Sequence, residues 1–304
     1  MALFEGAVAV VPTPLNEDES PDLEGIERLI NFLVDQKVGL FALGSAGEEM
    51  NLPFETRVAV ARKMAQVNDG RAGLLVGAGT FGVREALNFC EEVKDCKIGG
   101  VHVISYDTKM SDAGVENFYL TLADRMPFPL WLYQNTTRSS GIALDVVERL
   151  KKHPNIAGCK VAGWNFRTNL GFVLLADDDF EVVGSADPQF FAFMCLGLKA
   201  STTSSASCFP ELWHDLCEKF AADSLKDARK RSHEITRFLK RIPKTAYKDN
   251  GESSAELKYI LSLRGLCQEY CAKPYRNLTD DEKQGIRVVY EDYMKYLEDG
   301  IIRA

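Results

Sequence analysis

Short apolar runs alternate with longer amphipathic segments through the first two thirds of the chain. Successive apolar residues are typical of strands buried on both faces, whereas apolar residues every three or four positions are typical of helices. The predicted strands cover residues 7–11, 39–43, 74–76, 101–104, 130–133, 156–161, 180–183 and 200–204. The helices predicted between them cover residues 22–35, 53–67, 83–93, 115–125, 144–151, 169–175 and 189–196.

Only helices are predicted after the last strand. They cover residues 210–222, 226–241, 255–269 and 280–297, with a polar break at 243–254. Thr279 is placed to cap the final helix, because Glu282 follows three residues later as in a capping box. We therefore expect a first domain of residues 1–222, which carries the active site, and a C-terminal helical domain of residues 223–304.

The regular alternation of strands and helices favours a parallel sheet. Eight strand–helix units within about 200 residues favour a closed (β/α)8 TIM barrel with a C-terminal helical extension. The main alternative, an open doubly wound sheet, would carry a glycine-rich turn after its first strand. That turn reads Thr13-Pro14-Leu15 and holds no glycine, so the alternative is disfavoured.

The amino-acid composition and net charge limit which classes of molecule the protein is expected to bind. The 304 residues are 46% hydrophobic and 26% charged, which is enough apolar material for a large core. The formal net charge of −8 disfavours nucleic acid and anionic membranes as partners. No apolar run approaches the roughly 18 residues of a membrane span. Residues 1–12 also lack the basic segment of a signal peptide.

The cysteines and histidines point to no metal. The eight cysteines form no CxxC pair, and the four histidines show no metal-ligand spacing. We expect reduced thiols in the cytoplasm, no metal site, and no histidine-based nucleophilic triad.

The active site of an α/β barrel lies at the C-terminal ends of its strands. At the end of the sixth predicted strand stands Lys160, after an otherwise uncharged run at 155–159. A lysine among apolar neighbours is a candidate for desolvation, which favours the neutral amine that attacks a carbonyl carbon to form a Schiff base. The alternative is a lysine whose ammonium reaches solvent from the strand end, which on pattern alone is the more common case.

Three further side chains are expected at the same end of the barrel. Tyr133 ends the fifth strand and would transfer protons. Ser45 lies in a glycine-rich turn whose amides suit a carboxylate, and Arg138 suits bidentate binding of a carboxylate. Taken singly, each has an ordinary alternative: a core aromatic residue, a plain turn and a surface arginine.

Four segments together resemble a known family. Residues 44–48, Gly-Ser-Ala-Gly-Glu, resemble the Gly-Thr/Ser-Thr-Gly-Glu motif of the dihydrodipicolinate synthase and N-acetylneuraminate lyase superfamily. Residues 11–14, 133–141 and 156–162 resemble its Thr-Pro-Phe, Tyr-Asn-x-Pro-x-Arg-Thr-Gly and Ile-x-Gly-x-Lys-x-Ala segments. Order and spacing agree over about residues 5–210. The resemblance implies a (β/α)8 barrel and a class I, pyruvate-dependent aldolase or dehydratase.

The resemblance also implies roles at the pyruvate side of the site. Lys160 would form the Schiff base with pyruvate or another 2-oxo acid, so that no metal or organic cofactor is needed. Tyr133 would be the proton-relay phenol, assisted by Ser45. Ser45 and Ala46 would form the carboxylate-binding turn, although Ala46 lacks the second hydroxyl.

At the acceptor side the sequence departs from the family. Arg138 falls on the arginine that binds the aldehyde's carboxylate in the synthase branch, and Thr202 falls where a backbone carbonyl faces the site. Tyr106 is retained as a substrate-binding candidate. Asp107 stands where the synthases carry a second tyrosine that reaches a neighbouring subunit, and Asp107 is therefore a candidate for binding a different substrate group.

These residues predict a class I lyase that condenses pyruvate with an aldehyde, or cleaves such a product, in the manner of dihydrodipicolinate synthase. N-acetylneuraminate lyase, a 2-keto-3-deoxy sugar acid aldolase and a sugar acid dehydratase remain alternatives. A non-catalytic protein that binds a 2-oxo acid on the same barrel is an alternative of another class. The resemblance further implies a homodimer or homotetramer.

Overall fold

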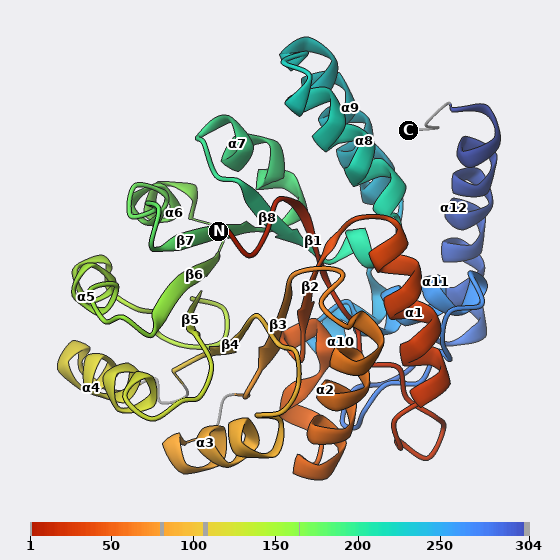
Figure 1. Ribbon diagram of the computed structural model, residues 1–304. Helices are drawn as coiled ribbons and strands as arrows, with labels where there is room; N and C mark the ends of the chain where they lie inside the picture. The colour runs from red at the N-terminus through yellow and green to blue at the C-terminus, as the bar shows by residue number, and fades with distance from the viewer. Residues whose placement is uncertain (1, 80–81, 106–108, 164, 301–304) are drawn as a thin grey trace.

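Eight parallel strands close into a barrel in the computed structural model, which describes residues 2–79, 82–105, 109–163 and 165–300 (Figure 1). Each strand pairs with the next in sequence, and the first closes the barrel against the eighth. The strands are β1 (Gly6–Val10), β2 (Gly39–Ala42), β3 (Leu74–Gly77), β4 (Gly100–Val103), β5 (Leu130–Asn135), β6 (Ile156–Ala162), β7 (Glu181–Ser185) and β8 (Ala200–Thr203). The predicted (β/α)8 barrel is confirmed.

A helix follows each strand on the outside of the barrel. The helices are α1 (Leu23–Asp35), α2 (Phe54–Asn68), α3 (Val83–Glu92), α4 (Asp112–Ala123), α5 (Leu144–Leu150), α6 (Phe166–Val173), α7 (Phe190–Cys195) and α8 (Pro210–Ala221). Short 3₁₀ turns also follow three strands, namely η1 (Ser45–Gly47), η2 (Glu49–Asn51), η3 (Asp187–Gln189) and η4 (Ser205–Ser207). These turns lie at the strand ends where an active site is expected.

Helix α1 shows why the amphipathic segments fold against the barrel. Its residues Ile26, Leu29, Ile30 and Leu33 share one face and are fully buried. Burying each such side chain contributes about 1.5–3 kcal/mol. Asp22 caps the helix by accepting a hydrogen bond from the Gly25 amide at 2.8 Å.

The C-terminal third is helical, as predicted. Its helices are α9 (Leu225–Lys240), α10 (Thr245–Asn250), α11 (Ser254–Leu263) and α12 (Asp280–Asp299). Helix α8 packs against β1 and α9 and takes the place of the barrel's eighth helix (Figure 1). The capping box of Thr279 and Glu282 at the start of α12 is confirmed. The division into domains at 222/223 stays a prediction.

Helices α6, α10 and α11 differ from the sequence prediction for local reasons. Helix α11 ends at Leu263 rather than near 269, because Gly265 adopts a left-handed φ of +71° that ends the helix. The predicted break at 243–254 contains α10, whose six residues are too few to show a clear helical period. Helix α6 begins at Phe166 rather than 169, because Asn165 caps it by accepting from the Thr168 amide.

No described helix combines the length and the apolar content needed to cross a bilayer. The eight cysteines are all free thiols.

Candidate active site

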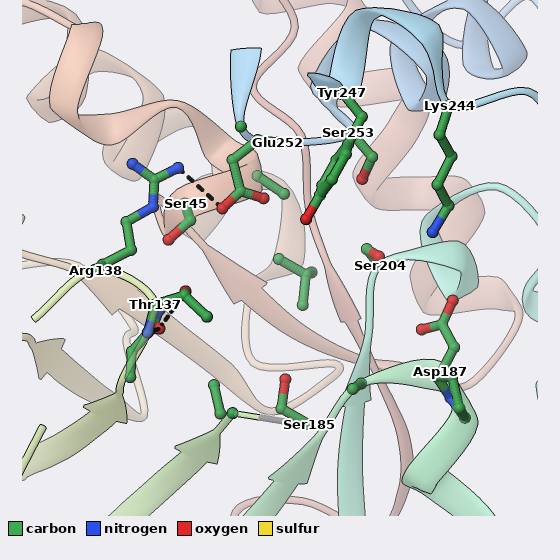
Figure 2. A pocket seen from close by; sticks show the side chains of 18 of the residues that line it. Ser45, Thr137, Arg138, Ser185, Asp187, Ser204, Lys244, Tyr247, Glu252 and Ser253 are labelled. Carbon is green, nitrogen blue, oxygen red and sulfur yellow. Dashed lines mark hydrogen bonds and ion pairs between the residues drawn. The ribbon is translucent and has the colours of Figure 1, made fainter. Parts of the chain in front are cut away.

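A cavity of about 1020 Å³ opens at the C-terminal ends of the strands (Figure 2). Strand ends supply one part of its lining, including Tyr133, Lys160 and Ser185. The turns that follow β2, β5 and β7 supply a second part, and residues 236–253 of the C-terminal helices supply the opposite wall. The barrel and the C-terminal region therefore share one pocket.

Lys160 and Tyr133 form the centre of the site. They are register partners on the neighbouring strands β5 and β6, so their side chains enter the barrel mouth side by side. The Lys160 Nζ donates to the Tyr133 Oη at 3.1 Å. Both residues are buried. The Lys160 Nζ also lies 3.9 Å from the centre of the Phe41 ring and 4.5 Å from that of Tyr133.

Among the described residues, no carboxylate forms an ion pair with Lys160. Its surroundings are aromatic faces and one phenol oxygen. The two ring faces and the phenol oxygen hold the Lys160 Nζ at the mouth of the barrel. The phenol is within reach to exchange a proton with the amine or with a group attached to it.

Asn135 fixes the tyrosine to the loop that follows β5. Its Nδ2 donates to the Tyr133 Oη at 3.2 Å, and its Oδ1 accepts from the Thr137 backbone amide and hydroxyl at 3.0 and 2.6 Å. Asn135 lines the pocket, although the sequence analysis did not single it out. The only feature of the sequence that could have indicated Asn135 as a site residue is its position two residues after Tyr133.

Ser45 and Ala46 lie in the 3₁₀ turn η1 after β2, and both line the pocket. The turn is fixed from two sides. The Thr13 Oγ1 donates to the Gly47 carbonyl oxygen at 2.6 Å, and the Ser254 Oγ donates to the Ala46 carbonyl oxygen at 3.2 Å. A Cβ at Gly47 would lie only 3.2 Å from the Val11 carbonyl oxygen, so this close approach favours glycine.

The glutamate that completes the Gly-Ser-Ala-Gly-Glu motif faces away from the pocket. Glu48 forms an ion pair with Lys258 of α11, with an Oε1–Nζ distance of 2.6 Å and both side chains fully buried. Its Oε2 accepts from the Ala272 amide at 2.6 Å, and the Lys258 Nζ donates to the Tyr270 carbonyl oxygen at 2.7 Å. Glu48 thus joins the turn at the barrel mouth to the C-terminal helices.

Three residues near these strand ends have a strained backbone conformation. Leu43, Glu48 and Ala186 all adopt a positive φ, of +51°, +62° and +79°. Such conformations cost about 1–3 kcal/mol each and persist where surrounding structure holds them. Ala186 directly follows β7, and its φ lies in the left-handed region that favours glycine.

Arg138 lines the pocket, as predicted, but its guanidinium is already bound by the protein. Its Nη2 donates to Glu252 Oε1 at 2.9 Å and to the Tyr275 hydroxyl at 3.0 Å. Figure 2 shows Arg138 and Glu252 pointing toward one another. Burial opposes the charge, but the hydrogen bonds to Tyr275 and Glu252 outweigh it, so the pKa of Arg138 lies above its ordinary value.

Of the remaining predicted binding residues, the structure describes Thr202, which does not line the pocket. Thr202 is buried in β8, where its hydroxyl donates to the Gly184 carbonyl oxygen at 3.1 Å. Its neighbour Ser204 lines the pocket instead. Tyr106 and Asp107 lie outside the described residues, so their roles stay predictions.

Several pocket residues come from the segment that the sequence analysis treated as a polar break. Lys244, Tyr247 and Glu252 lie around α10 and line the pocket. Figure 2 shows Tyr247 pointing into the pocket, with Lys244 facing Asp187 on the side away from Arg138. No motif marks these residues, and the sequence offered no signal for them.

Two buried titratable groups flank the site. Burial lowers the pKa of His102 to about 3, so its imidazole ring is neutral. The ring stacks on that of Phe41, with 4.0 Å between the ring centres, and its Nε2 donates to the Ala42 carbonyl oxygen at 3.0 Å. Burial raises the pKa of Glu49 to about 7, against the opposing charge of Arg138. Among the described residues, the Glu49 Oε2 has no hydrogen-bond partner.

Fold and site together define the class of protein: a (β/α)8-barrel enzyme with a buried lysine–tyrosine pair at the mouth of the barrel. The chain belongs to the dihydrodipicolinate synthetase family, whose model matches residues 3–292. It is accordingly a dihydrodipicolinate synthase-like lyase of the class I aldolase type.

The relatives agree in length as well as in fold. The 4-hydroxy-tetrahydrodipicolinate synthase of Archaeoglobus fulgidus is 26% identical over 289 residues, which cover 94% of this chain and 97% of the relative. The dihydrodipicolinate synthase structure from Bacteroides thetaiotaomicron is 25% identical, with a TM-score of 0.89, and covers 96% of this chain and 99% of that one. The sialic acid aldolase of Ruminococcus gnavus is 16% identical and shares the fold, with a TM-score of 0.90 over 99% of this chain and all of that one.

Proposed function

We propose that the protein joins pyruvate to an aldehyde, or reverses that reaction, through a Schiff base on Lys160. The observation that carries the proposal is the buried Lys160–Tyr133 pair, with 3.1 Å between Nζ and Oη, inside a pocket much larger than pyruvate. Names of relatives support it, since the Archaeoglobus fulgidus protein is a 4-hydroxy-tetrahydrodipicolinate synthase.

The reaction begins with the neutral amine of Lys160. Its nitrogen attacks C2 of pyruvate, the carbonyl oxygen takes up a proton, and loss of water from the carbinolamine gives a protonated imine. The imine withdraws electrons, so C3 releases a proton and becomes the nucleophilic carbon of an enamine. That carbon bonds to the aldehyde carbon, whose oxygen takes up a proton, and water then hydrolyses the new imine to free the lysine.

Tyr133 is proposed to transfer the protons in these steps. Its hydroxyl accepts a hydrogen bond from Lys160 and another from Asn135, so it is held beside the reacting nitrogen. Ser45 and the η1 turn are proposed to bind the carboxylate of pyruvate. Because the imine is the electron sink, the proposal requires no metal or organic cofactor.

The substrate separates three versions of Schiff-base chemistry on Lys160. They are a dihydrodipicolinate synthase-like condensation, cleavage of a sialic acid or 2-keto-3-deoxy sugar acid, and dehydration of a sugar acid. The sialic acid aldolase of Ruminococcus gnavus shares the fold, and that likeness does not select among the three.

Borohydride trapping tests the proposal. Incubation with pyruvate and borohydride should add one reduced pyruvyl group to the peptide that holds Lys160, read by intact mass and peptide mapping. The Lys160→Ala variant should show no adduct, whereas Lys152→Ala, which removes an exposed lysine of the same barrel, should still be labelled. Absence of the adduct from the unaltered protein would overturn the proposal. An adduct without turnover of any aldehyde would identify the alternative, a 2-oxo acid binding protein.

We further propose that the protein is a cytoplasmic homodimer or homotetramer. The eight free thiols support a reducing compartment. The assembly is proposed from the family resemblance.

A further inference from the structure

The anion-binding arginine expected at the acceptor side already holds a carboxylate of the protein. Arg138 and Glu252 form an ion pair at 2.9 Å, with side chains that are 18% and 21% exposed. The Tyr275 hydroxyl accepts from the same Arg138 Nη2 at 3.0 Å, and the Nη1 points to the Met50 sulfur at 3.3 Å. A charge-assisted hydrogen bond in such a partly buried place is stronger than one at an open surface.

The chain on both sides of Glu252 holds it in this position. Just before it, Asn250 donates to the Arg276 carbonyl oxygen at 3.0 Å and accepts from the Arg276 amide at 2.9 Å. Just after it, the Ser254 hydroxyl donates to the carbonyl oxygen of Ala46 in the η1 turn at 3.2 Å. Glu252 is therefore a fixed part of the pocket wall, and a substrate carboxylate competing for Arg138 would have to displace a tethered neighbour.

The charges around Arg138 leave little attraction for an anion. The positive charge of Arg138 is matched by Glu252. The Arg138 guanidinium therefore has a carboxylate partner within the protein before any substrate enters. At the Arg138 side, an incoming carboxylate would meet an ion pair that is neutral as a whole and would be repelled by Glu252, whereas an uncharged hydroxyl or carbonyl group would not be repelled.

We infer that Glu252 is a specificity-determining residue, which occupies Arg138 and so selects acceptor aldehydes that carry no carboxylate at the Arg138 side. The inference rests on the proposed aldol chemistry and names its acceptor as a neutral aldehyde. It replaces the expectation, drawn from the resemblance to the synthase branch, that Arg138 binds the carboxylate of the aldehyde.

The test compares two aldehydes of equal length with pyruvate as the donor. Butanal is neutral, and succinic semialdehyde carries a carboxylate at its far end. For each, kcat/KM is measured from the pyruvate consumed. The unaltered protein should have the higher kcat/KM with butanal. In Glu252→Gln, the ratio of kcat/KM for succinic semialdehyde to kcat/KM for butanal should rise about tenfold or more, because Arg138 is then free to bind the carboxylate of succinic semialdehyde. Adding Arg138→Gln to Glu252→Gln should remove the gain, and Glu298→Gln, at an exposed position on α12, should leave the ratio unchanged.

A binding measurement covers the case in which neither aldehyde is turned over. Protein fixed with pyruvate and borohydride keeps Lys160 occupied, so 4-hydroxybutyrate, an unreactive carboxylate of the same length, probes the acceptor side alone. Calorimetry should show about tenfold tighter binding to Glu252→Gln than to the unaltered protein.

An unchanged preference and an unchanged affinity in Glu252→Gln would overturn the inference, as would an unaltered protein that already favours succinic semialdehyde tenfold. The pyruvate adduct separates this failure from that of the proposed function. A protein that forms the adduct and shows no effect at Glu252 refutes the inference alone, whereas a protein without the adduct refutes the proposed function.

Discussion

At the scale of single residues, burial determines what each titratable group contributes. Lys160, His102 and Glu49 are all nearly inaccessible to solvent, and of these three Lys160 lines the pocket. The rings of Phe41 and Tyr133 face the lysine, a backbone carbonyl holds the neutral imidazole, and Arg138 acts on the glutamate. Burial lowers the pKa of His102 to about 3 and raises that of Glu49 to about 7, because it disfavours the charged form of each group.

The hydroxyl of Tyr133 is expected to matter for rate more than for binding. Tyr133→Phe keeps the ring beside Lys160 and removes the oxygen that lies 3.1 Å from the Nζ. Loss of a positioned proton-transfer group typically costs 10²–10⁴-fold in rate, so kcat should fall about 100-fold or more. Steady-state kinetics and the rate of adduct formation measure this. Tyr247→Phe, in the same pocket, serves as the comparison, and equal effects of the two substitutions would contradict the assignment.

The ionisation of Glu49 is expected to make the free energy of unfolding fall as the pH rises. Its native pKa of about 7 lies above its value in the unfolded chain, about 4.3, so between these pH values the native protein keeps a proton that the unfolded chain releases. Stability from this group is therefore lost as the pH rises. Glu49→Gln cannot ionise, and its free energy of unfolding relative to the unaltered protein should rise by about 2 kcal/mol from pH 5 to pH 8. Urea unfolding at both pH values measures the difference, and an equal difference at both would show that Glu49 ionises normally.

At the scale of elements, the barrel mouth depends on contacts with the C-terminal helices. The turn η1 accepts a hydrogen bond from the start of α11, Glu48 is paired with Lys258 within α11, and Glu252 between α10 and α11 is paired with Arg138 after β5. Residues 252–258, which join α10 to α11 and begin α11, therefore contact the turns that follow two different strands. This explains why the pocket is shaped by the C-terminal helices as well as by the barrel.

The Glu48–Lys258 pair provides a stability test of this connection. Lys258→Met would leave the buried Glu48 carboxylate without a cation, and removing one partner of a buried pair typically costs about 3–5 kcal/mol. Combining Lys258→Met with Glu48→Gln should recover part of the loss. Lys295→Met, which breaks a solvent-exposed pair with Asp292, should cost under about 1 kcal/mol. Urea unfolding measures all three variants, and a loss at Lys258 no greater than at Lys295 would contradict the structural role of the pair.

At the scale of the whole molecule, the barrel and the C-terminal helices enclose one site, and the matched relatives have nearly the same length. The expected homodimer or homotetramer has a direct check. Sedimentation equilibrium at micromolar concentration should give two or four times the chain mass. A single species at the mass of one chain would refute the expectation.

The sequence determined the barrel, the lysine–tyrosine pair and the family. Alternating strand and helix periods are local properties, and strand-end residues such as Tyr133 and Lys160 must meet at one mouth once the strands lie parallel in a closed barrel. The capping box of Thr279 and Glu282 is local for the same reason. By contrast, the partner of Arg138 was decided only by the tertiary structure. Glu252 lies 114 residues from Arg138 in the chain and carries no motif, and it reaches the pocket only because α10 and α11 fold back over the barrel mouth. Contacts between segments so far apart depend on packing, which no local pattern records.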